Sequence, residues 1–89
     1  MIRRRFVVQG RVQGVGFRSF AERQAIALGL HGSVQNQPDG SVLCIAEGPA
    51  AAVEALGERL RRGPSFARVT AVVVDDLPPT GQQGFSIEP

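Results

Sequence analysis

The stretch "GRVQGVGFRSF", Gly10–Phe20, decides the fold, because it marks the point where a strand gives way to a helix. The preceding run "RRRFVVQGRV" alternates polar and apolar residues, with Phe6 and Val8 on one face, as a half-buried strand does. The following run "FRSFAERQAIALG" carries one apolar helical stripe, made of Phe17, Phe20, Ala21, Ala25 and Leu28. Gly29 stands where such a helix is expected to end. We therefore predict a strand, a glycine-rich turn and an amphipathic helix.

The remaining elements all lie after residue 29, and turn signals mark their ends. "GSVQNQPDGSVLCIAEG" predicts two strands joined at a Pro38-Asp39-Gly40 turn. "GPAAAVEALGERLRRGP" predicts a helix with Pro49 at its first position and an end at Gly63-Pro64. "ARVTAVVVDDL" is a β-branched strand, and "FSI" is a short last strand after a turn-rich link.

The order of these elements, β-α-β-β-α-β plus a short C-terminal β, predicts the fold class. Its simplest packing is an α+β, ferredoxin-like sandwich: a mostly antiparallel sheet with both helices on one face. The 89 residues leave room for one domain, which we expect to span residues 1–89.

Composition limits the setting of the protein. The single cysteine, Cys44, excludes an internal disulfide and is expected to be a core residue in a reducing, cytoplasmic protein. No run approaches the roughly 18 apolar residues of a membrane span, so we expect no membrane partner. All ten basic residues are arginines, and the net charge is only +2, so bulk charge does not argue for nucleic acid.

The glycines of the opening stretch suggest an anion site. Gly14 and Gly16 flank Val15 directly before the helix, and glycine permits a positive φ. Successive amides in such a loop can converge on an anion, next to the positive end of the helix dipole. Arg18 stands at the same end and can bind phosphate with its planar fork. The alternative is a tight turn with a surface arginine, and both interpretations stay open on these grounds.

Known nucleotide and thiol signatures do not fit this loop. A Rossmann loop needs a glycine where Ser19 stands. A Walker A loop needs a lysine, and the chain has none. A thiol phosphatase needs a cysteine leading the loop, and none stands there. The loop therefore suits a phosphate without a nucleotide signature or a covalent nucleophile.

Two motifs carry a family resemblance. "GRVQGVGFR" resembles the phosphate loop of acylphosphatases, Gly-x-Val-Gln-Gly-Val-x-Phe-Arg, and "GSVQNQPDGSV" resembles that family's second signature. Their spacing, the element order and the Phe-x-Ile ending also match, so the resemblance covers essentially the whole chain. One departure is Ser33, where the family often has tryptophan; we expect weaker local packing there and no effect on the chemistry.

The resemblance implies hydrolysis of small acyl phosphates, such as acetyl phosphate or 1,3-bisphosphoglycerate, to a carboxylate and phosphate. It implies a phosphate cradle built from the backbone amides of Arg11, Val12, Gln13, Gly14, Val15 and Gly16. Arg18 would supply charge, and Asn36 would orient the attacking water. Inorganic phosphate or sulfate would compete for the loop. We expect no metal, cofactor or covalent intermediate, because no ligand cluster or nucleophile stands near these motifs.

The same fold class also allows two other functions. A ferredoxin-like RNA-binding module stacks bases on sheet aromatics, but the strand "SVLCIAEG" has none and the chain lacks Trp and Tyr. A non-catalytic, anion-binding regulatory module stays open. We take His31 as a surface or capping residue, and Asp75 and Asp76 as facing opposite sides of a strand. We expect a monomer without a nucleic-acid partner.

Overall fold

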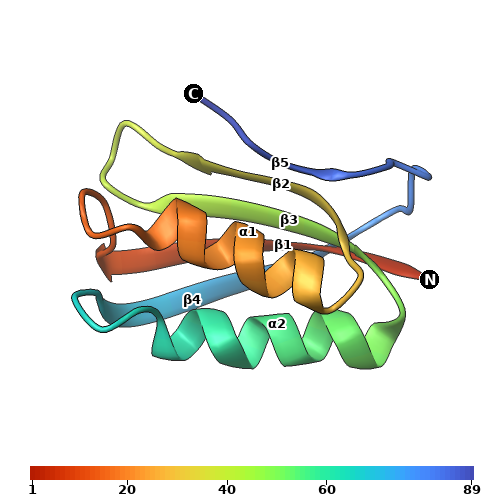
Figure 1. Cartoon of the computed structure of the whole chain (residues 1–89), viewed down its shortest axis with the longest axis horizontal. Helices are drawn as coiled ribbons and strands as arrows, with labels where there is room; N and C mark the ends of the chain where they lie inside the picture. The colour runs from red at the N-terminus through yellow and green to blue at the C-terminus, as the bar shows by residue number, and fades with distance from the viewer.

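The computed structural model describes all 89 residues and contains one five-stranded sheet with two helices. Along the chain the elements are β1 (Ile2–Arg11), α1 (Phe17–Ala27), β2 (His31–Asn36), β3 (Val42–Gly48), α2 (Ala50–Arg62), β4 (Arg68–Leu77) and β5 (Phe85–Ile87). The β1–α1 loop, the β2–β3 turn and the α2–β4 connection all lie at one end of the molecule (Figure 1).

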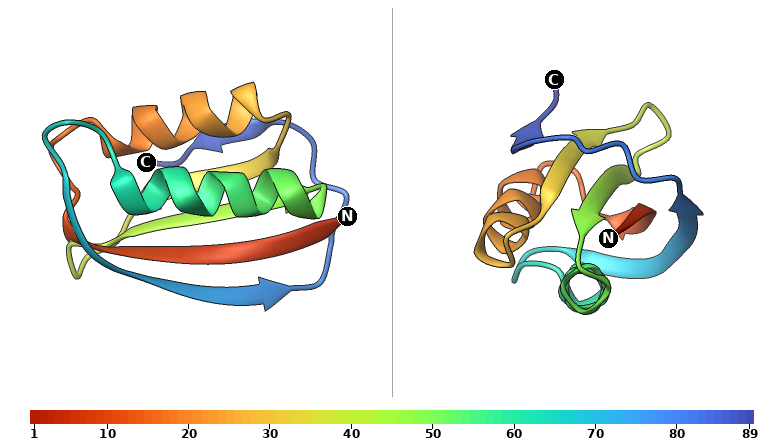
Figure 2. Two further views of the ribbon diagram at one scale, coloured as in Figure 1. Left: turned by 90° about the horizontal axis from the view of Figure 1, so that it is seen from below. Right: turned by 90° about the vertical axis from the view of Figure 1, so that its right-hand side faces the viewer.

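The sheet confirms the predicted fold class. Its strand order is β4-β1-β3-β2-β5. The pairs among β4, β1, β3 and β2 are antiparallel, and β5 pairs with β2 in parallel. Both helices cover the same face of the sheet (Figure 2). The chain is thus an α+β, ferredoxin-like sandwich with a short extra strand at one edge. Neither helix is long and apolar enough to cross a membrane.

The core lies between the helices and the covered face of the sheet. The side chains that are almost fully buried include Phe6, Val8, Phe17, Ala21, Ala25, Val34, Val42, Cys44, Val53, Leu56 and Leu60. Phe20 and Leu28 are only half-buried, because they lie at the margin of the α1 stripe. Cys44 is a core residue as predicted, and desolvation raises the pKa of its thiol to about 12.

Two local features differ from or refine the expectations. Pro49 precedes α2 instead of opening it: its φ of −57° suits a helix, but its ψ of 141° is extended. Its carbonyl oxygen accepts the amides of Ala52 and Val53 at 3.0 and 3.1 Å, so the helix begins one residue later. Ser33 lies opposite Ile45 on the face of the sheet away from the helices. Its small side chain therefore affects the open face and not the core.

A buried carboxylate holds the link between β4 and β5. Glu47 is 4% exposed, and it accepts the amides of Thr80 at 2.9 Å and Gly81 at 2.7 Å. It also forms an ion pair with Arg3 at 3.2 Å. These donors, the Thr80 amide first among them, lower the pKa of Glu47 to about 2. The link is therefore fixed against the sheet, and β5 reaches the edge of β2.

His31 has a structural contact at the same edge. Its Nδ1 accepts a hydrogen bond from the Gly84 amide at 2.8 Å, at the start of β5. The next bond along this edge runs from the Gly32 amide to the Gly84 carbonyl at 2.9 Å. His31 lies at the far end of β2 from Asn36, which agrees with its interpretation as a non-catalytic residue.

Candidate active site

The β1–α1 loop has the backbone shape that an anion requires. Gly14 has a φ of 74° and Gly16 a φ of 78°, whereas no residue other than glycine has a positive φ. The sign of φ therefore alternates along residues 13–16, which is the arrangement that makes successive amides converge. A Cβ atom at Gly14 or Gly16 would meet nothing within 4 Å, so glycine is needed here for its conformation and not for space.

The amides of this loop have no acceptor in the protein. Those of residues 12–16 donate to no backbone or side-chain oxygen. In α1 the first internal bond runs from the Phe20 amide to the Gly16 carbonyl at 3.0 Å, so the earlier amides of the helix are also free. Gly16 offers no capping side chain, and the first turn of α1 has no acidic residue. The positive end of the helix dipole is therefore uncompensated.

A pocket of about 130 Å³ lies against these amides. Its lining residues come from the loop, α1 and β2: Val12, Gly14, Gly16, Phe17, Arg18, Ser19 and Asn36. It is the smallest of four surface hollows, and the others measure about 200 to 300 Å³. It is the one hollow that combines free backbone amides with a guanidinium and an amide side chain.

Arg18, on α1, and Asn36, on β2, thus line the same pocket. One Arg18 Nη atom donates to the Glu88 carbonyl oxygen at 3.0 Å, which leaves its other N–H groups available. Asn36, at the end of β2, makes no side-chain hydrogen bond within the protein. The pocket therefore presents a fixed cation and an unpaired carboxamide to the same space.

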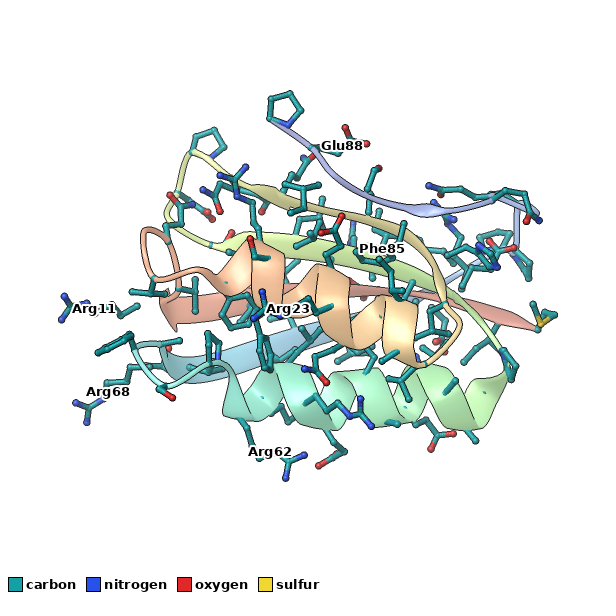
Figure 3. The ribbon with its side chains drawn as sticks, viewed as in Figure 1. Arg11, Arg23, Arg62, Arg68, Phe85 and Glu88 are labelled. Atoms are coloured by element: carbon teal, nitrogen blue, oxygen red, sulfur yellow. The ribbon has the colours of Figure 1, made fainter.

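The six predicted cradle residues divide into two groups. Val12, Gly14 and Gly16 line the pocket, whereas Arg11, Gln13 and Val15 do not. Arg11 is exposed and points into solvent (Figure 3). Val15 packs against the core. Any role of these three in anion binding would belong to their backbone amides.

The sequence did not reveal three further features of the pocket. Phe17 and Ser19 line it, and the Glu88 carbonyl orients Arg18. Ser19 could have been noticed as the third residue of α1, whose amide is free at the same end. The Glu88 contact carries no local signal, because it depends on where β5 docks.

The side chain of Gln13 turns away from the pocket to the β2–β3 turn. Its Nε2 donates to the carbonyl oxygens of Gln37 and Ser41, each at 2.8 Å. Within the turn, the Ser41 amide donates to Asp39 Oδ1 at 2.9 Å. The Ser41 hydroxyl bonds to the same carboxylate and, as its main cause, lowers the pKa of Asp39. The loop and the turn that follows Asn36 are therefore directly connected.

No group of three or more His, Cys, Asp or Glu side chains could hold a metal ion in this structure. The pocket itself contains no carboxylate, imidazole or thiol. Its chemistry consists of backbone amides, one guanidinium, one carboxamide and one hydroxyl.

Comparisons with known proteins match nearly the whole chain to one family. The family model described as Acylphosphatase matches residues 4–87. An acylphosphatase of Thermus thermophilus is 48% identical over 81 residues, covering 91% of this chain and 92% of that protein. An acylphosphatase of Moorella thermoacetica is 48% identical over 87 residues, covering 98% and 94%. The crystal structure of acylphosphatase from Bacillus subtilis has a TM-score of 0.97 and 40% identity, with both chains fully covered.

These relatives carry the name of an enzyme, a hydrolase acting on acid anhydrides, which favours catalysis over a non-catalytic anion-binding module. Both sequence motifs and all residues that line the pocket lie within the matched residues 4–87. The chain belongs to the acylphosphatase family.

Proposed function

We propose that this protein hydrolyses small acyl phosphates, R–CO–O–PO₃²⁻, in the pocket between the β1–α1 loop and Asn36. The observation that carries the proposal is that free loop amides, Arg18 and Asn36 all face one pocket. Phosphoryl transfer through a loose transition state needs positioning and electrostatic stabilisation more than covalent chemistry. These are the two functions that the lining groups can supply.

The phosphoryl group binds to the loop. The amides of the segment from Arg11 to Gly16 donate to its oxygens, and the positive end of α1 favours their charge. Arg18 donates its remaining N–H groups to the same oxygens. Because these donors are held in place before the substrate arrives, they need little reorganisation as charge develops.

Asn36 orients the attacking water. Its carboxamide has an acceptor and two donors but cannot take a proton, so it holds water without acting as a base. The water oxygen forms a bond to phosphorus while the bond from phosphorus to the acyl oxygen breaks. The electron pair leaves with the carboxylate, and the water proton passes to a phosphoryl oxygen.

No covalent intermediate is part of this proposal. Ser19 is the only hydroxyl in the pocket lining, and no His, Asp or Glu lies there to activate it. The same lack of an acid predicts weak activity on phosphate monoesters, whose alkoxide leaving group needs a proton. We further propose that the protein acts as a monomer in the cytoplasm. This reducing compartment suits a chain whose single cysteine is buried and forms no disulfide.

The test compares turnover with anion binding in Asn36→Ala. We expect kcat for benzoyl phosphate to fall at least about a hundredfold, while the Kd for inorganic phosphate stays within a few-fold of wild type. Gln35→Ala is the matched control, because its side chain lies on the opposite face of β2. Loss of phosphate binding along with turnover in Asn36→Ala would remove the water-orienting role. Faster wild-type turnover of p-nitrophenyl phosphate than of benzoyl phosphate would contradict the function itself.

A further inference from the structure

Gln13 is the one side chain of residues 12–16 that reaches across to another segment through hydrogen bonds. Both carboxamide hydrogens are used: Nε2 donates to Gln37 O and to Ser41 O at 2.8 Å. Both acceptors are backbone carbonyls of the β2–β3 turn. Each carbonyl also accepts a backbone amide within the turn, so removal of the Gln13 donor costs each of them one of two hydrogen bonds.

The turn that Gln13 contacts is itself internally bonded. The Gln37 amide donates to the Ser41 carbonyl at 2.9 Å, and the Gly40 amide donates to the Gln37 carbonyl at 3.1 Å. The Ser41 hydroxyl, which donates to Asp39 Oδ1, also lies 2.9 Å from Gln37 Oε1. The residue directly before this bonded unit is Asn36, the last residue of β2. Asn36 pairs with Val42 of β3, so the turn that joins these two residues borders Asn36 directly.

The loop on the other side is held by apolar contacts and not by hydrogen bonds of its own amides. Its amides have no acceptor, and Gly14 and Gly16 bring the backbone freedom of glycine. Val12 is buried in the core and Val15 packs against it, but neither apolar contact is a directional bond to the turn. The two bonds of Gln13 are the only hydrogen bonds in the structure between residues 12–16 and the turn.

We infer that Gln13 is a positioning residue that sets the distance between the phosphate cradle and Asn36. This inference rests on the proposed function, because it concerns how the water held by Asn36 is aligned with the phosphorus atom. Gln13 does not line the pocket, so it acts through the turn and not by contact with the substrate. Its loss should affect the in-line attack more than it affects phosphate binding.

The experiment uses Gln13→Glu, which keeps the shape and removes both donors at neutral pH. At pH 7.5 we expect kcat to fall between about tenfold and a hundredfold, because misplacement of reacting groups is that costly. The Kd for phosphate should change only a few-fold. Towards pH 5 the new carboxyl takes up a proton, which the two facing carbonyl oxygens favour, and it can then donate one bond. The kcat relative to wild type should therefore recover several-fold.

Gln35→Glu is the matched control. It adds the same charge next to Asn36 but on the opposite face of β2, where it replaces no hydrogen bond. It should lack both the loss of kcat and its recovery in acid. Equal kcat and equal pH profiles in Gln13→Glu and Gln35→Glu would overturn the inference.

Gln13→Ala keeps the inference testable if Gln13→Glu does not fold. It should show the same loss of kcat with no recovery in acid. A Gln13→Ala protein with wild-type kcat and only a lower Tm would show a structural role alone. Wild-type turnover tests the proposed function, whereas the Gln13 variants test only the positioning, so the two can fail separately.

Discussion

Arg18 and the carbonyl of Glu88 are joined by a hydrogen bond of 3.0 Å, although they lie 70 residues apart in the sequence. Glu88 is held in turn, because its amide donates to the Val34 carbonyl at 2.8 Å. The guanidinium at the start of α1 is thus oriented by backbone just beyond β5. Figure 3 shows Glu88 at the C-terminal end of the chain, on the side of the sheet edge formed by β5.

Removal of Glu88 and Pro89 should lower kcat/KM for an acyl phosphate by roughly tenfold or more, the range expected for losing a hydrogen bond to a charged group. Steady-state kinetics and circular dichroism measure this on a folded protein. Removal of Pro89 alone is the control, because it leaves an acceptor on Glu88. Unchanged kinetics in the longer deletion would show that Arg18 needs no orientation from this segment.

Substitution of Arg18 should affect both binding and turnover, because the phosphoryl group is anionic throughout the reaction. Arg18→Ala should raise KM and lower kcat, with a loss on the order of 3 kcal/mol or more in kcat/KM. Arg18→Lys should restore little, since an ammonium lacks the planar fork that bonds Glu88 and the anion together. A lysine variant within a few-fold of wild type would contradict this geometry.

Glu47 predicts a pH dependence of stability. Its pKa is about 2 in the folded protein and 4.5 ordinarily, so the unfolded chain binds the proton more tightly. The stabilisation is therefore fully present above pH 4.5 and is lost as the pH falls towards 2. Denaturant titrations should show that Glu47→Gln is less stable than wild type at pH 7 and that the difference narrows in acid. Glu54→Gln, at an exposed carboxylate without an ion pair, is the control and should show no such narrowing.

Cys44 should be inert in the folded protein. Its side chain is fully buried, and its pKa of about 12 leaves almost no thiolate at neutral pH. Thiol reagents should therefore neither label the native protein nor inhibit turnover, and labelling should appear only with denaturant. Rapid labelling under native conditions would mean that β3 opens without global unfolding.

Arg11 and Arg68 are expected to repel each other and to destabilise the fold at low salt. They are directly opposed in the β1–β4 register, both are exposed, and neither has a carboxylate partner. Figure 3 shows both side chains at the loop end of the molecule, pointing outwards. Like charges in register cost about 0.2 to 1 kcal/mol, so Arg68→Gln should stabilise the fold by that amount at low salt. The gain should vanish near 1 M salt, and the exposed Arg23→Gln should show no comparable gain.

The elements of this fold were predictable because their apolar residues recur at the spacing typical of strands and helices. Phe6 and Val8 on one face, and Phe17, Ala21 and Ala25 on one stripe, are the residues that the core buries. The one-residue error at Pro49 arose because proline fixes φ but not ψ. The positive φ of Gly14 and Gly16 before α1 could also be predicted, because this backbone conformation favours glycine.

The contacts that orient the site were not predictable. The bonds from Gln13 to the turn, from Arg18 to Glu88 and from Thr80 to Glu47 join residues distant in sequence. Each depends on the order of strands in the sheet and on where the last strand docks. A glutamine or a backbone carbonyl carries no periodic signal, so residue patterns alone do not say what it contacts.

β1 comes first in the sequence but lies inside the sheet, between β4 and β3. Arg3 pairs with Leu77, and Ile2 pairs with Gly48, so the strand that leads into the loop has only distant partners. Distant pairings slow folding, because chain closure must precede the contacts that reward it. We therefore expect the β1–α1 loop to take its native shape late in folding, so that phosphate binds the folded protein and not the transition state. In stopped-flow experiments phosphate should lower the unfolding rate and leave the refolding rate unchanged.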